Sequence, residues 1–234
     1  MEMRIPPLKE SKSPERAPYD FHSHTVWSDG EDTIETMITT AKNYKLTHFA
    51  ITDHYGSRSS KIDNSKINKL RQYLAEIRDV ASKFRDSLSV FAGLEIDYFR
   101  LGIDLEEVEA ARPDIILFEH GEYNLAHLQS IVEFADSVRI PVILAHPSLS
   151  FLEFPFRRVK EILEETRIII ELNVSADFDS PEIKELLDSG LKFSLGTDSH
   201  FSTKIGLLSP VYEYINRSGR NWKFFLTDKP LTTT

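Results

Sequence analysis

Short apolar runs alternate along this chain with longer amphipathic stretches. Each run is rich in Ile, Val, Leu or Phe, which is typical of buried parallel strands. The predicted strands are 19–23, 48–52, 89–97, 114–119, 141–146, 167–173 and 192–197. In the stretches between them, apolar residues recur at helical spacing. The predicted helices are 33–44, 65–84, 105–111, 125–138, 156–165 and 181–189.

Seven strand–helix units in series indicate one α/β domain. A distorted seven-stranded (β/α)7 TIM-like barrel is the preferred architecture, and an open doubly wound sheet is the alternative. Residues 1–18 contain four prolines among charged residues, which predicts an extended N-terminal arm. The folded domain is expected to cover 19–234.

Most of the predicted strands finish in a side chain that can bind a metal ion. In a β/α barrel the carboxyl ends of all strands meet at one mouth, so these side chains should converge there. The candidates at or just after strand ends are His22, His24, Asp29, His54, Glu95, His120, His146, Asp198 and His200. The sixth strand instead finishes in the sequence Glu-Leu-Asn at 171–173.

The spacing of these candidates indicates a cluster of ions. Side chains two apart on a strand point the same way, so the pairs His22/His24 and Asp198/His200 can each close on one ion. The donors exceed what one ion uses, which implies at least two ions with a carboxylate such as Glu95 as a bridge. Imidazole and carboxylate without sulfur suit Zn, Mn or Fe.

The alternative for any single histidine is an ordinary surface or core residue, as expected for His48 and His127. Six histidines at strand ends do not fit that interpretation, because burying so many titratable groups together without a cation is costly. The chain has no cysteine, which excludes disulfides and thiolate ligands and favours the cytoplasm. The net charge of −9 favours a small substrate over a nucleic acid. No apolar run approaches membrane-spanning length.

Several linked motifs resemble the PHP superfamily, the polymerase and histidinol phosphatase group. They lie in the same order along roughly 19–206. The motifs are DFHSHT (20–25), SDG (28–30), TDH (52–54), GLE (93–95), AHP (145–147) and GTDSH (196–200).

This resemblance implies a distorted seven-stranded barrel with a trinuclear metal site, and it assigns all nine candidates above as ligands of two or three divalent ions. The implied activity is hydrolysis of a small phosphomonoester by a metal-activated hydroxide. Histidinol phosphate or a nucleotide or sugar phosphate would be the substrate. Histidinol-phosphate phosphatases of the family often carry a basic residue after the sixth strand. Residues 173–178 contain none, which argues against histidinol phosphate.

Three further residues are expected to assist this chemistry. Asp53 would orient a ligand imidazole, the alternative being that it caps the turn after the second strand. Arg157 or Arg158 would clamp the substrate phosphate, the alternative being a solvated surface charge. Two other functions stay open: a nuclease or phosphodiesterase acting on nucleic-acid ends, and a non-catalytic metal-binding scaffold. An amidohydrolase-type barrel is a further alternative, but no lysine is evident at a strand end.

Overall fold

Strands and helices alternate along the chain in the computed structural model, in the order that the sequence predicts. The structure describes Arg16, residues 18–56, 60–62, 67–97, 103–119, 125–146, 156–174 and 180–209, Val211, Tyr214 and residues 223–224. The strands are β1 (Tyr19–Asp20), β2 (His48–Ile51), β3 (His54–Tyr55), β4 (Ser89–Asp97), β5 (Ile115–Glu119), β6 (Val142–Leu144), β7 (Ile169–Asn173), β8 (Lys192–Gly196) and β9 (Lys223–Phe224). The helices are α1 (Ile34–Asn43), α2 (Ile67–Ser82), α3 (Leu105–Ala111), α4 (Leu125–Ser137), α5 (Phe156–Glu164), α6 (Pro181–Asp188) and the short 3-10 helix η2 (Ser202–Lys204).

The helices begin where the sequence places caps. The side chain of Thr33 accepts a hydrogen bond from the backbone N–H of Thr36 at the start of α1. Ser180 does the same for Ile183 at the start of α6, and Pro181 follows it at the first helical position. α1 buries its apolar stripe, as its helical spacing predicts.

All strand pairings in the described sheet are parallel, in the order β1-β2-β4-β5-β6-β7-β8-β9. β3 also pairs with β4, in the register that β2 uses: Ile51 lies opposite Ala92, and His54 lies opposite Glu95. β3 is therefore the continuation of β2 after a two-residue interruption. Counted this way, β1 to β8 supply the seven strands that the sequence predicts.

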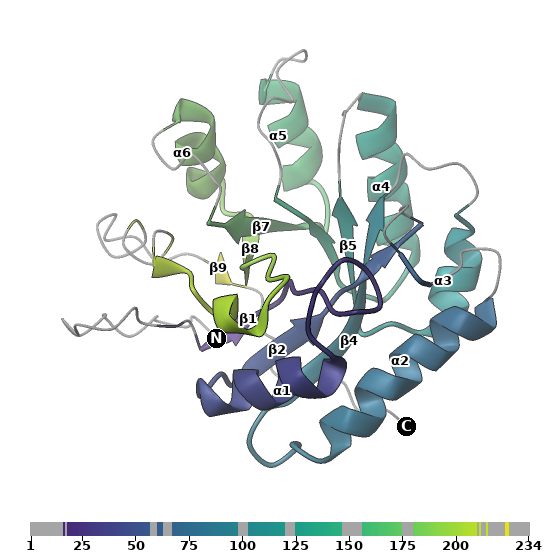
Figure 1. Cartoon of the computed structure of the whole chain (residues 1–234). Helices are drawn as coiled ribbons and strands as arrows, with labels where there is room; N and C mark the ends of the chain where they lie inside the picture. Colours follow the sequence, from purple (N-terminus) through teal and green to yellow (C-terminus); the bar gives the residue numbers. More distant parts are fainter. Residues whose placement is uncertain are drawn as a thin grey trace.

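The first strand, β1, meets β8 at the mouth, while β9 pairs with the first residues of β8. The backbone N–H of Phe21 donates to the carbonyl of Leu195 at 2.8 Å, and Ser23 forms a parallel bridge with Ser199. This contact closes the sheet into a barrel and rules out the open doubly wound alternative. The helices lie around the outside of the ring of strands (Figure 1). None of the helices in the described ranges has the length and apolar character needed to cross a lipid bilayer.

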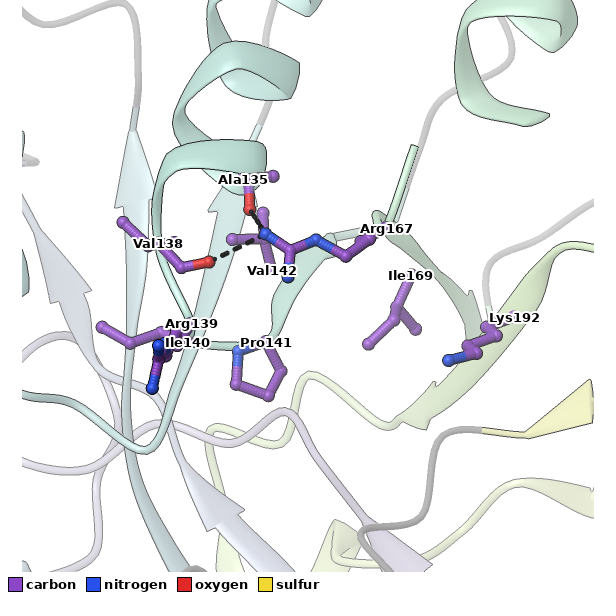
Figure 2. A pocket seen from close by; sticks show the side chains of 9 residues that line it. All are labelled: Ala135, Val138, Arg139, Ile140, Pro141, Val142, Arg167, Ile169 and Lys192. Atoms are coloured by element: carbon purple, nitrogen blue, oxygen red, sulfur yellow. Dashed lines mark hydrogen bonds between the residues drawn. The ribbon is translucent and has the colours of Figure 1, made fainter. Parts of the chain in front are cut away.

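A cavity of about 160 Å³ lies at the opposite end of the barrel, between the end of α4 and the first residues of β6, β7 and β8 (Figure 2). Arg167 crosses it and donates to the carbonyls of Ala135, Asp136 and Val138 at 3.0–3.1 Å. The first two carbonyls lie in the last turn of α4 and the third lies just after it, where no further helical N–H group is present to bind them. We interpret the contacts at this end of the barrel as stabilising the fold, whereas the predicted ligands lie at the opposite end.

Candidate metal centre

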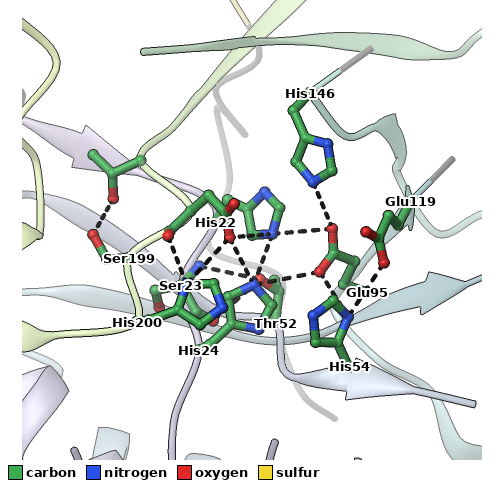
Figure 3. Close-up of polar contacts among 12 residues, drawn as sticks. His22, Ser23, His24, Thr52, His54, Glu95, Glu119, His146, Ser199 and His200 are labelled. Carbon is green, nitrogen blue, oxygen red and sulfur yellow. Dashed lines mark hydrogen bonds and ion pairs between the residues drawn. The ribbon is translucent and has the colours of Figure 1, made fainter. Parts of the chain in front are cut away.

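Six of the predicted ligands gather in one place in Figure 3: His22, His24, His54, Glu95, His146 and His200. They lie at or just after the carboxyl ends of β1, β3, β4, β6 and β8. Eight of the nine lie within a connected set of nitrogen–oxygen contacts of 3.8 Å or less: His22, His24, Asp29, His54, Glu95, His146, Asp198 and His200. The ninth, His120, lies outside the described residues.

Glu95 is the centre of this cluster. Its carboxylate is fully buried and lies within 3.3 Å of four imidazoles: His22 Nε2 at 3.2 Å, His24 Nε2 at 3.3 Å, His54 Nδ1 at 3.0 Å and His146 Nε2 at 3.1 Å. Burial alone would raise its pKa, but the imidazoles, His22 first, hold the pKa of Glu95 well below its usual value. Both carboxylate oxygens face donors from separate strands, as a bridging ligand requires.

A second part of the cluster is more open to solvent. Asp29 contacts His200 Nε2 at 3.2 Å and His54 Nε2 at 3.5 Å. Asp198 contacts His24 Nε2 at 3.0 Å. The side chains of Asp29, Asp198 and His200 are 38%, 34% and 30% exposed, whereas those of His22, His24 and Glu95 are 0% exposed. The cluster therefore has a buried floor and an accessible edge.

The donor set fits several cations. Three overlapping groups have ligand atoms within 4.8 Å of one another: His24/Asp29/His54/His200, His22/His24/Glu95 and His54/Glu95/Glu119. All the donors are imidazole nitrogens or carboxylate oxygens, which suit Zn, Mn or Fe.

Unsatisfied polar atoms within the cluster also indicate a cation site. His54 Nδ1 and Glu95 Oε2 are buried without a hydrogen bond among the described residues, although they lie 3.0 Å apart. His22 Nε2 and His24 Nε2 also face each other at 3.0 Å. A cation between such atoms would satisfy lone pairs that the protein leaves unmatched.

Two of the predicted ligands have unusual backbone conformations. His146 has φ of 23° and Asp198 has φ of 53°, in the left-handed region that residues with a side chain rarely adopt. Such strain concentrates at functional sites, where the surrounding structure holds it. Here it turns the chain sharply after β6 and β8, which directs both side chains into the cluster.

Asp53 holds the turn between two parts of the cluster, His24 and Asp29, by hydrogen bonds. Its buried carboxylate accepts hydrogen bonds from the N–H and hydroxyl of Thr25, both at 2.7 Å, and from the Ser28 hydroxyl at 2.6 Å. The Ser28 hydroxyl in turn lies 3.4 Å from His24 Nδ1. In the structure, Asp53 therefore contacts a ligand imidazole through Ser28 and not directly. It also fixes the 25–28 turn that leads to Asp29.

Two carboxylates that the sequence does not assign lie against the cluster. Glu119, the last residue of β5, lies 3.6 Å from His54 Nδ1. Burial, together with the Glu95 carboxylate, raises the pKa of Glu119 to about 7. Glu171, in β7, lies 2.9 Å from His22 Nδ1. The signal for Glu171 was a charged residue inside an otherwise apolar strand, and the signal for Glu119 was a second donor beside His120.

The predicted phosphate clamps lie apart from these contacts. Arg157 and Arg158 are 88% and 55% exposed in the first turn of α5, and each forms an ion pair with Glu161. Because α5 follows the mouth end of β6, this turn lies on the mouth side of the barrel. The structure shows no contact between either arginine and the cluster in the described part of the chain.

Comparisons with known proteins agree with this geometry. The PHP domain model matches residues 20–188. The DNA polymerase/3'-5' exonuclease PolX of Bacillus subtilis is 24% identical over 217 residues, which cover 87% of this chain but 37% of that longer protein. A protein of Proteus mirabilis named a probable phosphatase is 24% identical over 216 residues, covering 85% of this chain and 84% of that protein.

The fold has solved counterparts. The histidinol phosphate phosphatase of Lactococcus lactis, determined with zinc, L-histidinol and phosphate, superimposes with a TM-score of 0.64 at 18% identity, covering 92% of this chain and 97% of that one. A protein of Listeria monocytogenes described as a histidinol phosphatase gives a TM-score of 0.56 at 15% identity, covering 80% and 97%. These likenesses concern the fold. The domain match spans well over half of the sequence, and the chain belongs to the PHP domain family.

Proposed function

We propose that this protein is a metal-dependent phosphoesterase that hydrolyses a small phosphomonoester. The observation that carries the proposal is the set of three overlapping donor groups at the barrel mouth, which share His24, His54 and Glu95. Such sharing would hold two or three ions a few ångströms apart. The phosphatase names of a relative and of solved counterparts with this fold support the same reaction class.

Bound divalent ions would neutralise phosphate oxygens and lower the pKa of a water molecule into the neutral range. The protein's own part is to place the donors and to leave one side open. The buried floor of His22, His24 and Glu95 would fix the ions. Asp29, Asp198 and His200 form the accessible edge, so the phosphate group would approach from that side. Arg157 or Arg158, at the start of α5, would clamp the substrate phosphate.

A second function is favoured by a specific observation. The relative with a DNA polymerase/3'-5' exonuclease name matches 87% of this chain. The same cluster would then act on a phosphodiester at a nucleic-acid end. The net charge of −9 speaks for the small substrate. A non-catalytic scaffold fits less well, because a protein without turnover has no need of so many converging donors.

A panel of substrates would distinguish the phosphomonoesterase from the phosphodiesterase function. Protein reconstituted with Zn or Mn would be assayed on p-nitrophenyl phosphate, its bis-ester, nucleotides and single-stranded DNA. We expect monoester turnover that a chelator abolishes and that His200→Asn reduces at least about 100-fold. The matched control is His48→Asn, because His48 lies at the start of β2, where it packs against Phe91. No turnover of any substrate by the metal-loaded protein would refute both enzyme proposals.

We also propose that residues 19–234 form one domain and that 1–18 precede it as an extended arm. At the end of that arm, Arg16 stacks over the ring of Tyr44 at 3.6 Å and donates to the carbonyl of Thr203 at 2.9 Å. These contacts tie Arg16 to the barrel beside η2. A cytoplasmic location is favoured by the absence of cysteine.

A further inference from the structure

Glu171 is a carboxylate beside the cluster that belongs to none of the three donor groups. It lies in the middle of β7 and is 2% exposed. Both of its oxygens already have partners within the protein. Oε1 lies 2.9 Å from His22 Nδ1, and Oε2 accepts a hydrogen bond from the backbone N–H of His146 at 2.6 Å. Its place is therefore behind the ligands and not among them.

The first of these contacts decides which nitrogen of His22 is free. A neutral imidazole carries one N–H, and a carboxylate at Nδ1 accepts it there. The lone pair then lies on Nε2. That nitrogen faces Glu95 Oε1 at 3.2 Å and His24 Nε2 at 3.0 Å, on the side where a cation would sit. Without Glu171, the proton could occupy Nε2 and block that position.

The second contact holds the neighbouring ligand. His146 has the left-handed φ of 23°, and its backbone N–H is the atom that Glu171 binds. The ring of His146 stacks on that of His22, with centroids 5.4 Å apart and planes 16° from parallel. Both rings place Nε2 within 3.2 Å of the same oxygen of Glu95. One carboxylate on β7 thus sets the positions of two ligands from β1 and β6.

Gly196 makes room for this arrangement. It is the last residue of β8, and its φ is not positive, so its backbone conformation alone does not require a glycine. A Cβ at this position would lie 1.8 Å from Glu171 Oε1 and 2.6 Å from the Cβ of His22. Both distances are far below van der Waals contact. Any larger residue at 196 would displace the Glu171 carboxylate or the His22 ring.

We propose that Glu171 is a positioning residue that fixes the protonated nitrogen of His22 and the backbone of His146, in a space that only a glycine at 196 leaves open. This inference rests on the metal centre of the proposed function. Carboxylates behind metal-ligating histidines typically change metal affinity or activity by about 10- to 100-fold when they are replaced. Glu171 should act mainly on the ions that His22 binds.

Two variants test the role from opposite sides. Glu171→Gln keeps the shape of the side chain. Its NH2 group cannot accept a hydrogen bond, so one of the two bonds that the carboxylate accepts is lost. Gly196→Ala keeps the carboxylate but pushes it from its place. The control is Ser194→Ala, because Ser194 lies opposite Glu171 on β8 and its buried hydroxyl has no hydrogen-bond partner among the described residues. Metal content, zinc affinity by chelator competition and the melting temperature of the chelated protein would be measured for each.

We expect both variants to lose about 10- to 100-fold in zinc affinity at one or more sites, whereas Ser194→Ala matches the wild type. The ion held by His24, Asp29, His54 and His200 should remain. Affinities equal to those of Ser194→Ala in both folded variants would overturn the proposal. Phosphoesterase activity plays no part in this result. An inactive wild type with these metal losses would therefore refute the proposed function and leave the role of Glu171 intact.

A measurement on the wild type covers the case in which the variants do not fold. Nitrogen-15 NMR of histidine-labelled, zinc-loaded protein reports which ring nitrogen of His22 carries the proton. We expect a protonated Nδ1 and a metal-bound Nε2. Protonation at Nε2 would overturn the proposal without any substitution.

Discussion

Replacement of Glu95 by glutamine should divide the metal cluster instead of abolishing it. The substitution keeps the shape of a fully buried side chain and removes the charge that lies within 3.3 Å of four imidazoles. Two of the three donor groups contain Glu95, and the third, built on His24, Asp29, His54 and His200, does not. Ions held by the two groups that contain Glu95 should bind with lower affinity. The ion held by His24, Asp29, His54 and His200 should stay bound.

The size of the effect follows from the burial. Removing one partner of a buried, paired charge costs about 3–5 kcal/mol. At about 1.4 kcal/mol per tenfold, this corresponds to metal binding weaker by roughly 10²- to 10⁴-fold in each affected group. If the bound ions stabilise the fold by that amount, the melting temperature of the metal-loaded protein should fall by roughly 6–20 °C, since 1 kcal/mol shifts a chain of this size by about 2–4 °C.

Elemental analysis after dialysis against a weak chelator measures the number of ions per chain, and calorimetry gives the melting temperature. The control is Glu165→Gln, which removes the same charge from an exposed position after α5. Glu95→Gln should keep at least one ion and lose at least one. Full metal content with wild-type affinity would refute the bridging role. Loss of every ion from a folded protein would refute the separation into groups.

Four other substitutions make three separate predictions. Burial raises the pKa of Glu119 from 4.5 to about 7 in the metal-free protein. The unfolded chain therefore loses this proton first, and the stability of chelated protein should fall as pH rises between these values. Glu119→Gln should flatten that fall in melting temperature, and an unchanged slope would contradict it. Asp53→Asn weakens the acceptor of three hydrogen bonds from residues 25–28 and should cost about 1–3 kcal/mol in calorimetry; an unaltered melting temperature would argue against its supporting role. Arg157→Ala and Arg158→Ala should leave stability within about 0.5 kcal/mol and raise KM for p-nitrophenyl phosphate by up to about fivefold, and an unchanged KM in both would remove them from the site.

The sequence predicts the barrel well because its strands are continuous apolar runs. Each predicted helix and strand has a counterpart whose ends lie within two residues of the predicted ones, apart from the shorter β1, whereas β3, β9 and η2 have no predicted counterpart. The sequence does not predict the break between β2 and β3. There the hydroxyl of Tyr73, from α2, accepts a hydrogen bond from the backbone N–H of Asp53 and donates to the carbonyl of Gly93. β9 is also not predicted, because two residues carry no periodicity.

The site is predicted where a ligand ends a strand, because barrel geometry alone gathers strand ends. The sequence does not predict a residue whose role is to position another residue that lies far away along the chain. Nothing near Glu171 in the sequence signals the imidazole of His22, and nothing near Gly196 signals the carboxylate that it accommodates. Such contacts depend on which strands become neighbours when the ring closes.

His24 and His200, from opposite ends of the barrel sequence, stack with ring centroids 4.4 Å apart where the sheet closes. During synthesis, a nascent chain would expose its first imidazoles long before Asp198 and His200 leave the ribosome. Tight capture of the ion at the open edge must therefore wait until His200 has emerged. Uptake of that ion would report a closed barrel, and fragments that end before Asp198 and His200 would lack this ion and stay open to proteolysis.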